Sequence, residues 1–214
     1  MGVRMSVRPA RGLFVTFEGI DGCGKTTQAV LTYQYLSGHD HQVKLLREPG
    51  STRTAERIRK ILLDRRLTIE PATELLLYEA ARAEITAREI VPFLFQGKMV
   101  LCDRFYDSTT AYQGYGRKMD VRMVRSLHRV AVGDLKPDLT MLLDIDPHLA
   151  LSRLGNQRDR LETQSHAFFD RVRRGFLEIA RKERRRVKVI DASRSIEDIF
   201  SDIRKILARR IEIT

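Results

Sequence analysis

Short apolar segments rich in β-branched residues recur along the chain and alternate with longer segments of mixed polarity. An apolar run of roughly four to eight residues bounded by turn residues is typical of a strand that is buried on both faces. The pattern predicts five such strands, at residues 13–18, 43–46, 99–101, 139–143 and 187–190.

The segments between these runs carry apolar residues at the three- and four-residue spacing of an amphipathic helix. We expect helices at residues 26–36, 54–63, 72–95, 121–132, 147–154, 164–184 and 196–209. Pro92 lies inside the third of these segments. Because proline lacks a backbone donor and crowds the preceding turn, we expect a kink or an early end there.

Strands that alternate with helices are typical of a parallel sheet covered by helices on both faces. The fold class that we expect is therefore α/β, with a five-stranded parallel sheet in a single domain over residues 1–214. We expect residues 1–11, which are basic and precede the first apolar run, to form a flexible tail.

Composition excludes several classes of protein. The chain has 214 residues, 43% of them hydrophobic, and no apolar run approaches the roughly 20 residues that span a bilayer. The first apolar run ends at Glu18 and is too short for the core of a signal peptide. Two cysteines, Cys23 and Cys102, are too few for a disulfide framework. We therefore expect a cytoplasmic protein without a membrane anchor.

The charge balance points to anionic partners. Lys and Arg number 39 against 28 Asp and Glu, a net charge of +11, which suits nucleic acid, anionic lipid or phosphorylated small molecules. Many of the basic residues lie within residues 171–188, between apolar residues at helical spacing. This pattern favours the solvated face of an amphipathic helix over a nucleic-acid surface.

Residues 19–26, GIDGCGKT, form a complete G-x-x-x-x-G-K-[ST] motif between a predicted strand and a predicted helix. In that context the glycines let backbone N–H groups converge on phosphate oxygens, and the helix N-terminus adds its dipole. Lys25 would reach the β- and γ-phosphates, and Thr26 would ligate magnesium. The motif predicts an ATP site made by Gly19, Asp21, Gly22, Cys23, Gly24, Lys25, Thr26 and Thr27.

A P-loop is shared by motors, GTPases, ATPases and small-molecule kinases, so its surroundings must decide the class. The sequence lacks the Asn-Lys-x-Asp motif of guanine readers. The third strand instead leads into Asp103 and Arg104, at the sheet edge where α/β folds bind ligands. The arginine could hold a second phosphate, and Asp103 could join Thr26 at the metal. The alternative is a surface ion pair between Asp103 and Arg104.

Several motifs together resemble the thymidylate kinase family, which belongs to the P-loop nucleoside monophosphate kinases. They lie at residues 17–28, 47–50, 76–82, 103–105, 108–114 and 159–162, and the resemblance spans residues 13–207. It implies that the chain phosphorylates dTMP to dTDP with ATP and Mg²⁺, within a fold that carries a short lid. It also implies a homodimer.

The resemblance implies roles for residues on the acceptor side. Arg104 would grip the dTMP phosphate beside Arg47, and Asp21 would orient the sugar and phosphate. Tyr78 stands where the family usually stacks a phenylalanine on thymine, and Arg82 would donate to the base O4. The substrate-binding residues implied are Asp21, Arg47, Tyr78, Arg82, Arg104, Ser108, Thr109, Tyr112 and Gln113.

Each of these assignments has a plainer alternative. Tyr78 and Arg82 could be ordinary positions of an amphipathic helix, and Asp21 could stabilise its own loop. Tyr112, which the resemblance places against the deoxyribose 2′ carbon, could be a core aromatic residue.

Residues 152–163 resemble the mobile lid that closes over ATP in these kinases. The family divides into members with a basic residue after the P-loop aspartate and members with glycine there, whose lid supplies the arginine. Gly22 places this sequence in the second group. Arg153 and Arg158 would then neutralise the transferring phosphoryl, alongside Lys25 and Arg104. Arg160 could instead be structural, paired within residues 159–162.

Residues 191–193, after the last predicted strand, lie where such kinases cradle adenine, or form a plain turn before the last helix. Two other functions are compatible with the sequence. They are a different P-loop small-molecule kinase and, more remotely, a nucleic-acid-dependent ATPase. The second would explain the net charge.

Overall fold

The structure is a computed structural model that describes residues 12–155 and 159–211. A five-stranded sheet with the order β2-β3-β1-β4-β5 lies at its centre, and every pair of neighbouring strands is parallel. The predicted parallel α/β fold is confirmed. The strands are β1 (Phe14–Glu18), β2 (Val43–Arg47), β3 (Met99–Asp103), β4 (Leu139–Asp144) and β5 (Val187–Asp191).

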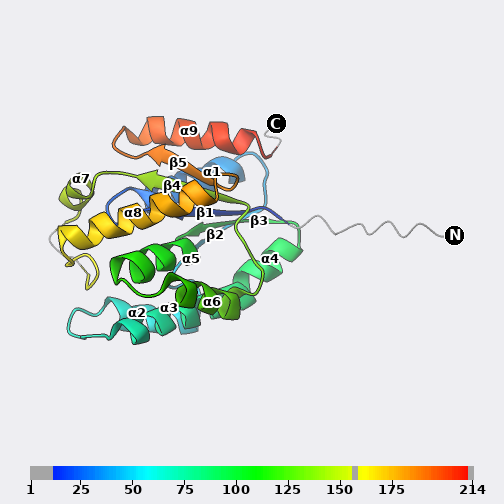
Figure 1. Cartoon of the computed structure of the whole chain (residues 1–214). Coiled ribbons are helices and arrows are strands. Elements are labelled where there is room, and N and C mark those ends of the chain that lie inside the picture. The colour runs from blue at the N-terminus through cyan, green and yellow to red at the C-terminus, as the bar shows by residue number, and fades with distance from the viewer. Residues whose placement is uncertain (1–11, 156–158, 212–214) are drawn as a thin grey trace.

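Helices cover both faces of this sheet (Figure 1). Helices α1 (Lys25–Ser37) and α9 (Ile196–Ala208) pack together on one face. The other face carries α8 (His166–Lys182) and the remaining helices. These are α2 (Arg53–Leu63), α3 (Pro71–Ile85), η1 (Thr86–Ile90), α4 (Val91–Phe95), α5 (Tyr106–Thr109), η2 (Thr110–Gly116), α6 (Val121–Val132) and α7 (Pro147–Ser152). Of these, α4 contacts β3 directly.

The core follows the alternation of side chains along the strands. All five residues of β1 are buried, as expected for a central parallel strand. Phe17 packs with residues of α1 and α9, whereas Phe14 packs with Ile85 and Leu94 on the opposite face. None of the helices in the described ranges is both long and apolar enough to cross a membrane.

The predicted helix at 72–95 is interrupted. The chain passes from α3 into a stretch of π-helix, η1, and then into the short α4, where Pro92 occupies the first turn. Proline cannot donate within a helix but is tolerated in the first turn, so the chain widens into π geometry ahead of Pro92. Helical structure is thus present over the predicted segment, and its interruption is the π-helix at residues 86–90 rather than a break at Pro92 itself.

Residues 106–116, for which the sequence pattern predicted no element, form α5 and the π-helix η2. Their polar residues Ser108, Thr109, Thr110 and Gln113 are all buried. A periodicity of apolar residues misses this segment because its inward face is polar.

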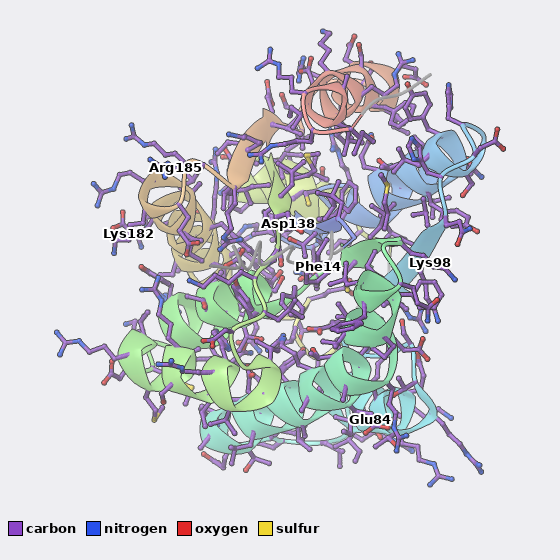
Figure 2. All side chains as sticks on the ribbon, turned by 90° about the vertical axis from the view of Figure 1, so that its right-hand side faces the viewer. Phe14, Glu84, Lys98, Asp138, Lys182 and Arg185 are labelled. Carbon is purple, nitrogen blue, oxygen red and sulfur yellow. The ribbon has the colours of Figure 1, made fainter. Side chains whose placement is uncertain are left out.

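The amino and carboxyl ends of the strands lie on opposite sides of the molecule and carry different residues. Figure 2 looks onto the edge where the strands start, with Phe14 close to Asp138, whose carboxylate accepts the Phe14 N–H at 2.8 Å. The carboxyl ends of the strands lie at the opposite edge, where the P-loop follows β1. The predicted tail at 1–11 and Arg158 lie outside the described residues.

Candidate active site

The loop from β1 to α1 has a conformation that requires glycine. Gly19, Gly22 and Gly24 have φ angles of 139°, 80° and 92°. A Cβ atom on Gly22 would lie 2.1 Å from the backbone oxygen of Ala150, and one on Gly19 would lie 2.5 Å from that of Leu143. The loop therefore rests directly on the backbone of β4 and α7. A basic side chain at position 22 does not fit this geometry.

Helix α1 presents its N-terminus to the loop. Gly24 is its N-cap, and its first turn carries no acidic residue, so the backbone N–H groups there remain for an anion. Lys25 is buried, and its ammonium donates to the backbone oxygen of Ile20 at 2.7 Å. Burial raises the pKa of the Cys23 thiol although Lys25 opposes this. The Cys23 thiol is therefore not ionised here, and its backbone N–H donates to the Ile20 oxygen at 3.4 Å.

Thr26 and Asp103 meet as the sequence predicted. The Thr26 hydroxyl donates to Asp103 Oδ2 at 2.5 Å, which joins the start of α1 to the end of β3. A hydroxyl and a carboxylate are hard oxygen ligands, and Mg²⁺ is usually held by one or two such side chains plus phosphates and water. The pair therefore fits a magnesium ion that is carried by a nucleotide.

Arg104 crosses from the end of β3 to the P-loop. Its Nη1 donates to the Gly19 oxygen at 3.0 Å and to Ser108 Oγ at 2.9 Å, and its Nη2 pairs with Asp21 Oδ1. Burial raises the pKa of Asp21, but Arg104 and Lys25 outweigh it and hold that pKa below its usual value. The alternative of an ion pair between Asp103 and Arg104 does not form, since Asp103 binds Thr26 and Arg104 binds Asp21.

Tyr112 is a core aromatic residue that also lines the cavity. Its ring is 4% exposed and packs edge-on against Phe168 and Phe176. Its hydroxyl donates to Asp21 Oδ2 at 2.6 Å, so the same side chain reaches the site. Asp21 is thereby held by both Arg104 and Tyr112 rather than by its own loop.

A second group of arginines lies beside the P-loop. Arg47, at the end of β2, pairs with Glu56 at 3.2 Å, and Arg59 of α2 donates to the Pro49 oxygen at 2.9 Å. Burial and the nearby Arg47 lower the pKa of Arg59, so an anion at this place would relieve their repulsion. Sequence analysis missed Arg59 because it stands among other basic residues of an amphipathic helix.

Arg82 is 1% exposed and holds three elements together. It donates to Glu48 Oε2 at 2.8 Å, to Glu79 Oε1 at 2.5 Å and to Thr109 Oγ1 at 2.9 Å. Burial raises the pKa of Glu48 to about 7 although Arg82 opposes the shift. A guanidinium has five N–H donors, so these three bonds leave donors for a base in the cavity.

The other residues predicted for the base surround the same space. Tyr78 is half-buried and faces the cavity, where burial raises the pKa of its phenol. Ser108 and Thr109 lie on α5, and both line the cavity. Gln113 donates to Glu74 Oε1 at 2.9 Å, so Glu74 of α3 fixes the orientation of the Gln113 amide. Arg82 is buried and does not extend to solvent as a surface arginine of an amphipathic helix would, and both Tyr78 and Arg82 line the cavity. Their contact with a base stays a prediction.

The segment between α7 and α8 is anchored at both of its described ends. Arg153 donates to the backbone oxygens of Ala192 at 3.0 Å and Ser193 at 3.3 Å. This contact brings the first lid arginine onto the turn that the sequence associated with adenine. Arg158 lies outside the described residues, so its position is not assigned.

Arg160 is structural, but not through the partners expected. Its Nε donates to the Leu62 oxygen at 2.9 Å, and its Nη2 lies 2.6 Å from Glu74 Oε2. Glu74 is fully buried and also accepts from Arg117. The pairing of Arg160 within residues 159–162 is therefore wrong. No local sequence pattern predicts this contact, because the partners of Arg160 lie in α2 and α3.

One cavity of about 450 Å³ connects these groups. The P-loop and the Thr26–Asp103 pair line this cavity. Arg104, which contacts the P-loop, lines it too, together with Arg47 and the polar side chains around Tyr78. Two anion sites in one cavity suit the transfer of a phosphoryl group between two phosphorylated molecules. The fold and the site define a P-loop nucleoside monophosphate kinase.

Comparison with known proteins specifies the family. A family model described as "Thymidylate kinase" matches residues 17–203. The chain is 46% identical to a thymidylate kinase of Symbiobacterium thermophilum over 91% of this chain and 92% of that one. It is 44% identical to a thymidylate kinase of Chlorobium luteolum over 94% and 99%, respectively.

A solved structure agrees. The crystal structure of thymidylate kinase from Ehrlichia chaffeensis superposes with a TM-score of 0.76 and 37% identity, over 92% of this chain and 99% of that one. The chain belongs to the thymidylate kinase family.

Proposed function

We propose that the chain transfers the γ-phosphoryl group of ATP to dTMP through the residues of this cavity. Phosphorylation of dTMP to dTDP is the activity of the family to which the chain belongs. The observation that supports our assignment of residues is that the P-loop and the Thr26–Asp103 pair line one cavity together with Arg47 and Arg104. The other kinases and the nucleic-acid-dependent ATPase are not favoured by the comparisons.

On the donor side, the backbone N–H groups of residues 22–27 would surround the ATP phosphates, as the free N-terminus of α1 allows. Lys25 would leave the Ile20 oxygen and bind the β- and γ-phosphates. Thr26 and Asp103 would hold Mg²⁺. When bound, Mg²⁺ would neutralise charge on the phosphates and fix their geometry.

On the acceptor side, Arg104 and Arg47 would bind the dTMP phosphate. Asp21 and Tyr112 would adjoin the sugar, with a ring that leaves no space for a 2′-hydroxyl. The base would stack on Tyr78 and accept from Arg82. Ser108, Thr109 and Gln113 would complete the polar wall of the base pocket.

The reaction itself needs positioning and charge stabilisation rather than a strong base. A phosphate oxygen of dTMP attacks the γ-phosphorus, and the bond from that phosphorus to the β–γ bridging oxygen breaks, which leaves ADP. Lys25, Arg104 and the lid arginines Arg153 and Arg158 would surround the negative charge as it shifts to the leaving oxygen. Lid closure would exclude water as a competing acceptor.

Two further properties belong to the same proposal. We place the protein in the cytoplasm, where ATP is abundant and the free thiols of Cys23 and Cys102 stay reduced. We also propose a homodimer, because Leu76, Phe95 and Val130 expose large apolar side chains on α3, α4 and α6. Light scattering that gives the mass of one chain would exclude the dimer.

The test of this function is direct product analysis. The purified chain, incubated with ATP, Mg²⁺ and dTMP, is expected to form dTDP and ADP in equal amounts. Omission of dTMP provides the control for uncoupled ATP hydrolysis. ADP formation without dTDP would reject the assignment.

A further inference from the structure

Glu18 is a buried carboxylate that the proposed reaction does not use. It is the last residue of β1, directly before the P-loop, and its exposed fraction is 0%. Because side chains alternate along a strand, it points to the same face as Phe14 and Thr16. That face is covered by α5, the helix that follows Arg104.

Both carboxylate oxygens of Glu18 bind groups next to Arg104. Oε1 accepts the backbone N–H of Phe105 at 2.8 Å, and Oε2 accepts the Ser108 hydroxyl at 2.5 Å. The Ser108 oxygen in turn accepts from Arg104 Nη1 at 2.9 Å. Glu18 therefore fixes the peptide that follows Arg104 and, through Ser108, the guanidinium itself.

Arg104 needs such support because its backbone is unusual. Its φ angle is 72°, in the left-handed region that residues other than glycine rarely adopt. This conformation reverses the direction of the chain just after Asp103, so that Asp103 faces Thr26 while Arg104 faces Gly19 and Asp21. An uncommon conformation at a binding residue persists only where its surroundings hold it.

The carboxylate suits this task better than a neutral acceptor. Burial, with help from Asp107, raises the pKa of Glu18 to about 8, so its ionisation is costly, while the hydrogen bonds from Ser108 and the Phe105 N–H favour the ionised form and oppose this shift. A carboxylate nevertheless accepts on both oxygens, whereas an amide offers only one acceptor and would turn an N–H group toward either Phe105 or Ser108.

We propose that Glu18 is a positioning residue, which holds Phe105 and Ser108 so that the Arg104 guanidinium is aimed at the acceptor phosphate. The inference rests on the proposed role of Arg104. It predicts that Glu18 strengthens binding of the acceptor's phosphate group. Glu18 should not affect binding of the acceptor's nucleoside part or of ATP.

The experiment compares the affinities of dTMP and thymidine for the full chain by calorimetry, without ATP. In Glu18→Gln the affinity for dTMP should fall roughly tenfold or more, because the charge-assisted contact between the Arg104 guanidinium and the dTMP phosphate would lose its alignment. The thymidine affinity and the KM for ATP should stay near those of the parent.

A matched control is available in Asp138, a half-buried carboxylate at the other end of β1. It accepts the backbone N–H of Phe14 at 2.8 Å, much as Glu18 accepts that of Phe105. Asp138→Asn should lower the unfolding midpoint while the ratio of dTMP to thymidine affinity stays at the parent value. A general loss of packing would move both variants alike.

Ser108→Ala keeps the proposal testable where Glu18→Gln does not fold. It breaks the link from Glu18 to the guanidinium but leaves the bond to Phe105, so it should also weaken dTMP more than thymidine. Equal loss for both ligands, or parent affinity in a folded Glu18→Gln, would overturn the role of Glu18. If Arg104→Ala also kept the parent ratio, the phosphate site itself would be misassigned, and both proposals would fall.

Discussion

The hydroxyl of Thr26 and the carboxylate of Asp103 lie 2.5 Å apart although 77 positions separate them in the sequence. The parallel pairing of β1 with β3 produces this proximity, because it brings the carboxyl ends of the two strands to one edge. The pair is the place where the donor nucleotide and its metal would meet the sheet.

This pair gives the first prediction. Thr26→Ala and Asp103→Asn should each raise the Mg²⁺ concentration that gives half-maximal rate by roughly tenfold or more. Removal of a side chain that binds a metal, or that orients a ligand of the metal, typically weakens metal affinity by this amount. Thr26→Ser, which keeps the hydroxyl, is the matched control and should resemble the parent. An unchanged Mg²⁺ dependence in both first variants would exclude the site.

Lys25 gives the second prediction. Because its ammonium would neutralise charge that grows toward the transition state, Lys25→Ala should lower kcat by at least about a hundredfold. The fold and the binding of dTMP should persist, as judged by circular dichroism and calorimetry. Lys60→Ala, at an exposed position of α2, should turn over at the parent rate. A near-normal kcat in folded Lys25→Ala would contradict the P-loop assignment.

The lid arginines give the third prediction. Gly22 has no space for a basic side chain, so the charge should come from the lid. Arg153→Ala or Arg158→Ala, or both, should reduce kcat far more than dTMP affinity. Arg153→Ala should also raise the KM for ATP, because Arg153 supports the turn at Ala192.

The exposed Arg174 on α8 provides the control for the lid variants, and Arg174→Ala should keep parent kinetics. Parent rates in both folded lid variants would mean that the charge comes from elsewhere, such as Arg47 or Arg104.

Tyr112 gives the fourth prediction. The parent should strongly prefer dTMP over its 2′-hydroxylated counterpart, since a buried hydroxyl without a partner costs about 1 to 3 kcal/mol in addition to any clash. Tyr112→Phe should keep this preference because the ring remains. Tyr112→Ala should narrow the ratio of kcat/KM values, measured for both nucleotides under identical conditions.

The same ring packs against Phe168 and Phe176, so Tyr112→Ala should also lose roughly 3 to 5 kcal/mol of stability. Measurements below its unfolding midpoint separate the two effects. A folded Tyr112→Ala that retains the parent ratio would refute the steric account.

The features that could be predicted from the sequence are those that depend on residues close together in the chain. The five apolar runs predicted all five strands, because strands buried on both faces need continuous apolar sequence. The P-loop was predictable because its function depends on consecutive residues. By contrast, α5 and η2 were missed because Ser108, Thr110 and Gln113 are polar yet buried, which reverses the usual relation between polarity and burial.

Contacts between distant segments were the other source of error. Arg160 binds Glu74 and the Leu62 oxygen, and neither partner can be inferred from the neighbourhood of Arg160 in the sequence. Glu18 looks like the polar end of a strand, and its role depends on Phe105 and Ser108. A single sequence reveals motifs of neighbouring residues. Contacts between residues far apart in the chain can be identified only when the fold is known.

We expect this cavity to phosphorylate dTMP in preference to other nucleotides. The kcat/KM values for dTMP, dUMP, dCMP, dGMP and UMP, measured from ADP formation at saturating ATP and Mg²⁺, test this preference. The value for dTMP should be the highest, with those for UMP and dGMP far below it. A higher value for any other monophosphate, or ATP consumption that depends on added DNA instead of dTMP, would contradict this expectation.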